Sequence, residues 1–440
     1  MRGIVLGFFL ICVTIAISIS CRAQELPRRG FLGIKLENLT DDTRRVMGIG
    51  DVKGVLISGI IPNSTASEAG FRQGDVLLSI NGMPVSSPSE AIAMVGGLKG
   101  GEPFRYELLR DKKKIDTSAL LKSFPEEHYP DLDVLYSAVN SVAGTQRIII
   151  TKPKNKRRMP VVMFIGGIGC YSLDYALDTS VSEIQLLNLL ARAGYMCVRV
   201  EKPGIGDGAK NCKPCNSISF MQELDGYVQA TLALKKRDDV DSNAIFIFGH
   251  SMGGVMAPLV AQKTNIKGII TYGTIGSNFL EYLMKTRRTV AQAYDMSPEE
   301  TDDYIKEFCE CAGYYFVDKM TTAEAAQKDT NCRDYLSVFD DRSRAYNDEM
   351  YALNIPALWK PFGGKTLLLW GESDFISSRD DQQIIASTIN YYHKGNAEFV
   401  TVKNADHGMH IAASFQEAHA SPGPYNPEVG KTVLAWLQKQ

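Results

Sequence analysis

One serine in the middle of the chain stands where a catalytic nucleophile could be held. Ser251 lies in the run AIFIFGHSMGG, in which five mostly apolar residues lead into G-H-S-M-G at 249–253. The apolar run predicts a buried strand, and the glycines two places on either side of the serine predict a very tight turn. The pattern G-x-S-x-G between a strand and a helix is typical of a nucleophile elbow, which exposes the serine hydroxyl at the end of a sheet. The alternative is an ordinary turn serine.

A nucleophilic serine needs a base, because its hydroxyl is a weak nucleophile at neutral pH. His407 lies in NADHGMH, a small polar loop after the predicted strand EFVTV near the end of the chain. This is where the base of an elbow serine belongs in chain order. We therefore predict His407 as the base and keep His410 as the alternative, whereas His250 is expected to point away from the nucleophile.

A catalytic histidine needs an acid that fixes its tautomer and stabilises its cation. Asp374 lies in TLLLWGESDFIS, just beyond the end of a predicted strand. Glu372, two residues closer to that strand, is the alternative. The order along the chain is then Ser251, Asp374, His407, as expected when an elbow serine lies at the end of a mostly parallel sheet.

The negative charge that develops on a carbonyl oxygen during acyl transfer needs preorganised N–H donors. One donor is expected from Met252, at the start of the helix after the elbow. The other is expected from the glycine loop G-G-I-G that follows the strand VVMFI, from Gly167 or Ile168. The alternative is a glycine-rich turn without a catalytic role.

These residues require strands that end at a common edge, and the second part of the chain predicts such a sheet. Apolar strands alternate with helices from about residue 130 onward, which indicates a mostly parallel sheet covered on both faces. Helices are predicted to start near Ser180, Ser219 and Ser251. The predicted strands are VVMFI (161–165), YMCVRV (195–200), AIFIF (244–248), GIITY (268–272), TLLLW (366–370) and EFVTV (398–402).

The alternation breaks over about 275–363, where helical, charged and aromatic stretches carry no strand signal. An insertion of this length between strands predicts a helical cap over a site. The alternative is an additional surface subdomain.

The first part of the chain has a different pattern. Residues 67–85 read SEAGFRQGDVLLSINGMPV, in which an alternating strand is followed by the turn pair Asn-Gly. A short amphipathic helix (87–98) and the strand PFRYELLRD follow. Together these features resemble a PDZ domain over 28–122, a small β-rich α+β domain, in an arrangement similar to that of bacterial periplasmic proteases of the HtrA type.

A peptide site is expected in this segment. Gly30, Phe31, Leu32 and Gly33 resemble the carboxylate-binding loop of PDZ domains, and a loop flanked by glycines can aim backbone N–H groups at a C-terminal carboxylate. The strand that starts at Ile34 can then accept an extended peptide as an added edge strand. The alternative is a PDZ domain that serves only as a spacer or packs on its neighbour.

The elbow, acid and base resemble the α/β-hydrolase superfamily over roughly 160–440. EKPGIGDG is similar to the D-x-x-G-x-G-x-S segment of that family, with Glu201 in place of the aspartate and Gly208 in place of the serine. The resemblance implies an α/β-hydrolase sheet, mostly parallel, with the helical cap, in a domain that spans 130–440. It also implies an acyl-enzyme mechanism, for which we expect no cofactor and no metal.

Within this superfamily, GHSMGG is met mostly in esterases, lipases and related acyl hydrolases. Peptidases of the prolyl-oligopeptidase type more often have an aromatic residue where Met252 stands. We therefore expect an exported serine hydrolase that cleaves an ester or other acyl bond. The alternatives are a serine peptidase or acyltransferase on the same triad, or a non-catalytic PDZ-based binding or scaffold protein.

The first residues of the chain predict export. Arg2 is followed by a long uncharged apolar run, and C-R-A at 21–23 can be a cleavage site. A cleaved signal peptide over 1–23, a lipoprotein signal that lipidates Cys21, and an uncleaved membrane anchor are the alternatives. The expected location is periplasmic, secreted or lipid-anchored at the cell envelope. The net charge of −2 indicates no nucleic-acid partner.

Seven cysteines follow this segment, an odd number that cannot all pair within one chain. C-K-P-C at 212–215 has no second such pair and no histidine pair nearby, so a zinc site is not expected. An oxidising compartment favours a disulfide within a set of five cysteines, with buried thiols as the alternative. These five are Cys212, Cys215, Cys309, Cys311 and Cys332. Cys197, inside an apolar strand, is expected to be a buried thiol.

Overall fold

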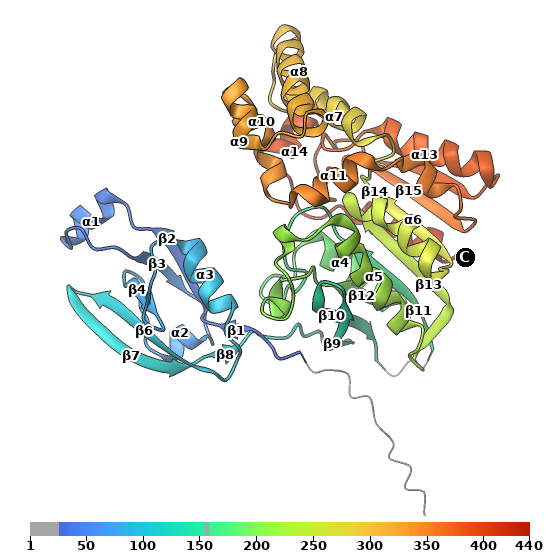
Figure 1. The fold of residues 1–440 in the computed structure, drawn as a ribbon. Coiled ribbons are helices and arrows are strands. Elements are labelled where there is room, and N and C mark those ends of the chain that lie inside the picture. The colour runs from blue at the N-terminus through green and yellow to red at the C-terminus, as the bar shows by residue number, and fades with distance from the viewer. Residues whose placement is uncertain (1–25, 155–157) are drawn as a thin grey trace, which may run out of the picture.

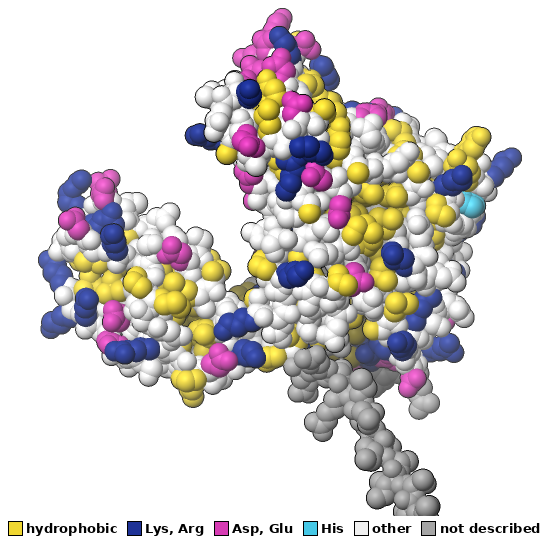
Figure 2. Space-filling view, viewed as in Figure 1, with side chains coloured by type: hydrophobic (Ala, Val, Ile, Leu, Met, Phe, Trp, Pro, Cys, Tyr) yellow, Lys and Arg dark blue, Asp and Glu magenta, His cyan; other side chains and the backbone are white. Residues whose placement is uncertain are grey.

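The structure, a computed structural model, describes residues 26–154 and 158–440. The predicted signal segment, 1–23, lies outside the described residues. Figure 1 shows a small β-rich body formed by the first part of the chain and a larger body with a central sheet. On the face drawn in Figure 2, acidic and basic side chains are interspersed, in keeping with the small net charge. No helix within the described ranges is long and apolar enough to cross a membrane.

The small body is an antiparallel sheet with three helices. Its elements are β2 (Ile34–Asn38), α1 (Asp41–Met47), β3 (Val55–Ile60), α2 (Thr65–Glu68), β4 (Val76–Ile80), β5 (Met83–Pro84), α3 (Pro88–Gly96), β6 (Pro103–Arg110) and β7 (Lys113–Leu120). The strand order is β2-β3-β4-β6-β7, with β5 paired to β4. Asn81 and Gly82, which join β4 to β5, both have positive φ (52° and 77°), as the turn pair predicted.

Two short strands close this body where it meets the larger one. β1 (Gly30–Phe31) pairs with β8 (Lys122–Ser123), so the chain enters and leaves the small body side by side. Arg28, just before β1, forms ion pairs with Asp174 and Asp207 of the larger body, each at 2.7 Å. The segment before the small body is thereby attached to the larger body.

The segment after β8 is attached as well. The Glu127 carboxylate accepts two hydrogen bonds from the Arg199 guanidinium, at 2.6 and 2.8 Å, and the two side chains are at most 1% exposed. Tyr129 is buried in the apolar core of the larger body. The paired strands β1 and β8 are called the stem of the small body below. The segments on both sides of this stem are thus attached to the larger body.

The larger body is built on an eight-stranded sheet. Its strands are β9 (Leu132–Ser141), β10 (Gly144–Pro153), β11 (Met159–Ile165), β12 (Met196–Val200), β13 (Val240–His250), β14 (Gly268–Tyr272), β15 (Lys365–Gly371) and β16 (Ala397–Val402). The order is β16-β15-β14-β13-β11-β12-β10-β9, and every pairing from β16 to β12 is parallel. All six predicted strands are present. The antiparallel hairpin β9–β10 was not predicted, because half of it is only partly buried and its sequence is mixed.

The central strand shows why its sequence is apolar throughout. In β11, Val161, Met163 and Ile165 belong to one apolar core cluster, whereas Val162 and Phe164 belong to another, and all five are 0% exposed. A strand with helices on both faces has no solvent-facing side, which removes the alternation of polar residues. The helices of these layers are α4 (Ser182–Arg192), α5 (Phe220–Leu234), α6 (Met252–Thr264), α13 (Arg379–Tyr392) and α15 (Pro427–Leu437).

Of two helix starts predicted at a serine, one is confirmed and the other is wrong. Ser219 caps α5 and forms a capping box with Gln222, as the sequence indicates. Ser180 does not cap α4, whose N-cap is Val181 without a side-chain hydrogen bond. The backbone N–H and hydroxyl of Ser180 instead bind the carboxylate of Asp178, at 2.9 and 2.6 Å. This local turn competes with the cap.

Helices fill the stretch between β14 and β15 and stand beside one end of the sheet (Figure 1). They pack around aromatic rings, among them Phe279, Phe316 and Phe339, whose centroids lie 5.1 to 6.4 Å apart. These elements are α7 (Phe279–Ala293), α8 (Pro298–Ala312), the π-helical turn η3 (Gly313–Val317), α9 (Thr322–Lys328), α10 (Cys332–Asp340), α11 (Arg344–Ala352) and α12 (Ile355–Trp359). Short helices elsewhere are η1 (Gly206–Gly208), η2 (Cys215–Ser217) and α14 (Phe415–Ala420).

The part of the chain that the structure describes contains two disulfides, and one differs from the expected set. Cys311–Cys332 lies within that set and joins α8 to α10. Cys215 pairs with Cys170, a residue outside the set, and Cys212 remains a free thiol. The pairing depends on which Cα atoms approach within about 4.4–6.8 Å, and chain spacing alone does not reveal this. Cys197 is a buried free thiol, as expected.

Within the described ranges, one group of side chains has the spacing of metal ligands: Cys311, Asp329 and Cys332. Both of its sulfurs are joined in the disulfide, so they offer no thiolate.

Candidate active site

Ser251 lies on a strained turn between β13 and α6. Its backbone angles, φ 53° and ψ −120°, are ones that L-residues rarely adopt. A Cβ on Gly249 would lie 2.5 Å from the carbonyl oxygen of Gly253, and a Cβ on Gly253 would lie 2.0 Å from that of Ile165. Backbone therefore occupies the space that side chains at 249 and 253 would need, and the turn is as tight as the sequence indicates.

His407 and Asp374 are in direct contact. Nδ1 of His407 lies 2.9 Å from Oδ2 of Asp374, whose side chain is 0% exposed. The same carboxylate accepts from the Ser377 hydroxyl at 2.6 Å and from the N–H groups of Ile376 and Ser377 at 2.9 Å. These bonds fix the orientation of the carboxylate. They keep the proton of a neutral His407 on Nδ1 and leave Nε2 as an acceptor.

The two histidines nearest the elbow have opposite pKa shifts. Burial lowers the pKa of His407, but the charge and hydrogen bond of Asp374 outweigh burial and raise that pKa above its ordinary 6.5. Burial, together with the neighbouring His407 charge, lowers the pKa of His250 to about 4. At pH 7, His250 is therefore neutral, whereas His407 is suited to take and hold a proton.

His250 supports the loop that carries His407. Its Nε2 lies 2.8 Å from the carbonyl oxygen of His407, so the neutral ring carries its proton on Nε2. The Tyr272 hydroxyl donates to the carbonyl oxygen of Asp406, at 2.6 Å, in the same loop. The sequence did not indicate this supporting position, because it depends on two loops far apart in the chain.

The alternative base and acid lie elsewhere. The ring of His410 contacts Asp406 instead of Asp374, with Nδ1 3.2 Å from Oδ2 of Asp406. The Glu372 carboxylate accepts from the N–H of Asn404 at 3.3 Å. The structure thus brings together His407 and Asp374 and leaves both alternatives outside that pair.

Gly273 is a further residue that the sequence did not single out. Its φ is +60°, and a Cβ there would lie 2.7 Å from Oδ2 of Asp374 and 3.0 Å from Nδ1 of His407. The sequence offered one clue to its role: Gly273 directly follows the predicted strand GIITY, which lies next to the strand that leads into the elbow. A side chain at this position would displace the histidine–aspartate pair.

The glycine loop after β11 lies against the elbow. A Cβ on Gly167 would lie 3.4 Å from Cβ and 3.7 Å from Oγ of Ser251. The N–H of Gly167 donates to the Tyr171 hydroxyl at 2.9 Å. Met252 is the first residue of α6, where helix N–H groups have no partner inside the helix. The residues expected to supply N–H donors are therefore next to Ser251 in space.

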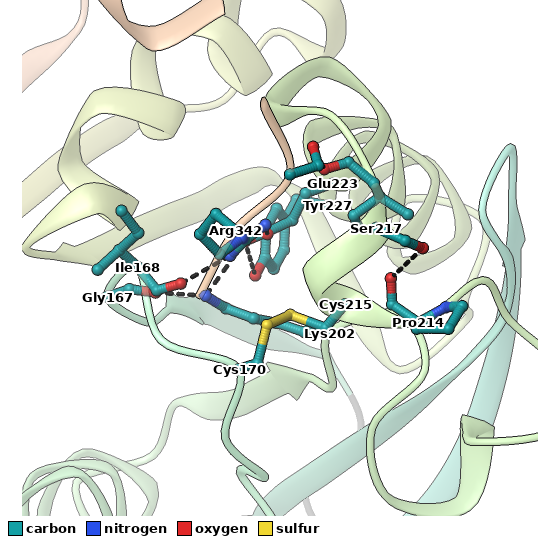
Figure 3. The surroundings of a disulfide bond; sticks show 12 residues. Gly167, Ile168, Cys170, Lys202, Pro214, Cys215, Ser217, Glu223, Tyr227 and Arg342 are labelled. Atoms are coloured by element: carbon teal, nitrogen blue, oxygen red, sulfur yellow. Dashed lines mark hydrogen bonds and ion pairs between the residues drawn. A yellow bond between two sulfur atoms is a disulfide. The ribbon is translucent and has the colours of Figure 1, made fainter. Parts of the chain in front are cut away.

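Buried charges hold this loop from behind (Figure 3). Lys202 donates to the carbonyl oxygen of Gly167, and Arg342 donates to that of Ile168, while both cations contact Glu223. Burial lowers the pKa of Lys202 to about 8, against the charge of Glu223, which raises it. Sequence reasoning missed these residues. Lys202 lies in the EKPGIGDG segment, which resembles the family pattern, but no sequence motif contains Glu223 or Arg342.

The predicted peptide loop, residues 30–33, is only partly a loop. Gly30 and Phe31 form β1, and the N–H of Gly30 donates to the carbonyl oxygen of Leu98 at 2.7 Å. The carbonyl groups of the next residues are held by neutral donors. The Thr65 hydroxyl donates to the carbonyl oxygen of Phe31 at 2.6 Å, and backbone N–H groups of Ala66 and Ile61 donate to those of Leu32 and Gly33 at 2.9 Å. β2 follows this loop and pairs only with β3 in the described sheet. One edge of β2 is therefore open to an added strand.

Comparison with known proteins identifies the family. The alpha/beta hydrolase family matches residues 162–418, more than half of the chain, and the PDZ domain family matches residues 30–121. The chain belongs to the alpha/beta hydrolase family. It is an α/β-hydrolase enzyme whose hydrolase fold is preceded by a PDZ domain.

Curated relatives match over a short stretch. The periplasmic serine endoprotease DegP of Escherichia coli (strain K12) is 36% identical over 95 residues, which cover 22% of this chain and 20% of that protein. A probable periplasmic serine endoprotease DegP-like of Pseudomonas putida (strain GB-1) is 29% identical over 121 residues, 27% of this chain and 25% of that protein. The chain thus spans about a quarter of the length of these relatives.

Solved structures of similar fold include Est1E from Butyrivibrio proteoclasticus with ferulic acid bound. It is 14% identical with a TM-score of 0.45, covering 69% of this chain and 98% of that one. An acylaminoacyl peptidase from Pyrococcus horikoshii is also 14% identical with a TM-score of 0.45, covering 77% of this chain and 48% of that one.

Proposed function

We propose that this chain is an exported serine hydrolase that cleaves an ester or related acyl bond with Ser251, His407 and Asp374. The observation that supports it most is the 2.9 Å contact between His407 and Asp374 on loops after β16 and β15. These loops lie at the same edge of the parallel sheet as the elbow after β13. Family membership supports the reaction class.

In the proposed reaction, Oγ of Ser251 attacks the acyl carbonyl carbon and its proton passes to Nε2 of His407. Asp374 stabilises the resulting imidazolium. The tetrahedral intermediate collapses, and the leaving group departs with the proton from His407. Water then attacks the acyl-enzyme by the same route and releases the acid and the free serine.

The oxyanion of the intermediate is proposed to be held by the N–H of Met252 and by one N–H of the loop at Gly167 and Ile168. Met252 begins α6, so the positive end of the helix dipole favours the anion there. The close approach of Gly167 to Ser251 supports the second donor. Preorganised donors of this kind commonly contribute a factor of about 10²–10³ each to turnover.

For the PDZ domain we propose capture of an extended C-terminal peptide at Gly30–Gly33 and the open edge of β2. The tethered carbonyl groups of Phe31, Leu32 and Gly33 support this proposal, because oxygens that accept bonds from the domain itself need not face a carboxylate. The N–H of Gly30 donates to the carbonyl oxygen of Leu98, so the proposed donors are the N–H groups of the residues after Gly30. Export is proposed from the pattern of residues 1–23. Curated relatives named as periplasmic proteases give it further support.

The function is tested by labelling the purified chain with a fluorophosphonate probe, which reacts with activated serines. Wild type should be labelled, and Ser251→Ala should not. Ser337→Ala, which alters an exposed serine of the cap, is the matched control and should be labelled as wild type. A folded wild-type chain that resists the probe would favour a scaffold protein. If p-nitroanilides of short peptides were cleaved faster than p-nitrophenyl esters, a peptidase would be favoured instead.

A further inference from the structure

Three buried charged residues surround the glycine loop after β11. The side chains of Lys202, Glu223 and Arg342 are 2%, 1% and 1% exposed. They come from three separate places: the end of β12, helix α5, and the cap segment between α10 and α11. Burying charge is costly even when it is paired, so a cluster assembled from three elements at this loop calls for an explanation.

The two cations bind consecutive carbonyl groups of the loop, as Figure 3 shows. Nζ of Lys202 donates to the carbonyl oxygen of Gly167 at 2.5 Å, and Nη1 of Arg342 donates to that of Ile168 at 2.6 Å. Glu223 bridges the cations. One of its oxygens lies 3.3 Å from Nζ of Lys202, and the other accepts from Nη2 of Arg342. The three residues together carry one net positive charge.

Holding a carbonyl also orients the next amide. A trans peptide points its C=O and N–H in opposite directions, and the described residues contain no cis peptide. The bond from Lys202 to Gly167 therefore turns the N–H of Ile168 away from the cations. The N–H of Gly167 is already used, because it donates to the Tyr171 hydroxyl. Of the two donors expected from the sequence, Ile168 is the one left without an acceptor in the described structure.

We propose that Lys202, Glu223 and Arg342 are positioning residues that aim the N–H of Ile168 at the acyl oxygen during attack by Ser251. Lys202 holds the peptide plane that carries this N–H. Arg342 acts on it in two ways: it holds Lys202 in place through Glu223, and it fixes the other side of Ile168 through the carbonyl group of that residue. The inference rests on the proposed function, since an oxyanion forms only if Ser251 attacks. Arg342 belongs to the cap, so the cap contributes to the placement of the oxyanion donor through Glu223 and the carbonyl group of Ile168. The net positive charge behind the loop further favours the developing negative charge.

The primary test is Arg342→Met, assayed with p-nitrophenyl acetate and with phenylboronic acid, which adds to a catalytic serine as a tetrahedral anion. We expect kcat to fall at least about tenfold, because a misplaced oxyanion donor acts mainly on the transition state. Affinity for phenylboronic acid should fall in proportion, while KM changes by less than about threefold. Arg342→Lys, which can still donate to Ile168, should recover part of the loss.

Arg344→Met is the matched control. Arg344 also lies in the cap, donates to two carbonyl groups, those of Met320 and Tyr315, and pairs with Asp348. None of these partners belongs to the glycine loop. This variant should keep kcat and phenylboronic acid affinity within about twofold of wild type, since a general loss of cap stability is not the proposed effect.

The outcomes separate the inference from the proposed function. A folded Arg342→Met with wild-type kcat, or one in which only KM rises, would overturn the positioning role. If Arg342→Met does not fold, Lys202→Met is judged by the same criteria. Ser251→Ala is assayed in parallel. Wild-type turnover that does not depend on Ser251 would overturn the proposed function and this inference together. Ser251-dependent turnover with unaffected positioning variants would overturn the inference alone.

Discussion

The chain contains two glycine loops whose carbonyl groups accept hydrogen bonds from neighbouring segments: one in the PDZ domain and one after β11. The donors differ in charge between the two loops. In the PDZ loop, a threonine hydroxyl and two backbone N–H groups hold the carbonyls of Phe31, Leu32 and Gly33. In the hydrolase loop, buried Lys202 and Arg342 hold them. Neutral donors are enough to shape a loop that would meet a carboxylate already charged in solution. Buried cations add a fixed field, which matters where negative charge appears only during a reaction.

The largest effect on turnover, which bears on the hydrolase site and not on the PDZ loop, is expected at the proposed base. His407→Ala should lower kcat on p-nitrophenyl acetate by about 10⁴-fold or more, because the members of a triad act as a unit. His410→Ala is the matched control, since His410 contacts Asp406 and not Asp374, and it should cost only a few-fold. Peptide binding by the PDZ domain should not change in either variant. A greater loss from His410→Ala would move the base to His410.

A smaller loss with a distinct pH signature is expected at Asp374. The base must be neutral to accept a proton, so the raised pKa of His407 places the acidic limb of kcat/KM above pH 6.5. Asp374→Asn removes the charge that raises this pKa. The limb should therefore move to lower pH, while maximal turnover falls by about 10³–10⁴-fold.

The same pair also contributes to stability. The contribution is fully present below the unfolded pKa of about 6.5 and is lost as pH rises through the higher folded value. Urea unfolding of wild type and Asp374→Asn between pH 5 and 8 measures it. An acidic limb that stays in place in the variant would show that Asp374 does not set the charge of His407.

The contacts that attach the PDZ stem to the larger body predict an intermediate effect on stability, which depends on which residues are deleted. Removing residues 1–123 also removes Arg28 and leaves buried Asp174 without its ion pair, at a cost of about 3 kcal/mol in unfolding free energy. Deleting only 31–122, with a short glycine linker in their place, keeps Arg28 and should retain nearly full stability and esterase turnover. Urea unfolding of the two chains makes the comparison. Equal stabilities would show that the Arg28 anchor contributes little.

The smallest effect is expected at the neutral tether of the PDZ loop. Thr65→Val leaves the carbonyl of Phe31 without its hydroxyl donor, and a lost buried hydrogen bond of this kind costs about 1 kcal/mol. Calorimetry with a peptide that ends in an apolar residue should show roughly fivefold weaker binding. Thr43→Val, on α1, a helix without buried residues, is the control. Unchanged affinity in Thr65→Val would show that the tether does not shape the peptide site.

The sequence predicted the structural features that are encoded in a few consecutive residues. The elbow is encoded in eleven consecutive residues, and the parallel strands are marked by apolar runs that only burial on both faces explains. Ser251 directly follows such a run, and Asp374 and His407 lie a few residues after the ends of β15 and β16. Strand order therefore places all three residues at the same edge of the sheet.

The parts that it missed depend on contacts between distant segments. Glu223 and Arg342 look like ordinary helical and loop charges in the sequence, and only the fold brings them to the glycine loop. The Cys170–Cys215 pairing was missed for the same reason. The hairpin β9–β10 lies at the sheet's edge, where partial exposure removes the apolar signal that marks the central strands.

The pairing of β1 with β8 has a consequence for how such a chain can evolve. Gly30 and Ser123 face each other across an antiparallel ladder, where opposite Cα atoms lie about 4.5–5.5 Å apart. A domain whose own ends are that close could replace the PDZ domain in a single recombination event without moving any strand of the hydrolase sheet. The pairing of β1 with β8 therefore separates the inserted domain from the hydrolase sheet, so that the first can change while the second keeps its strands.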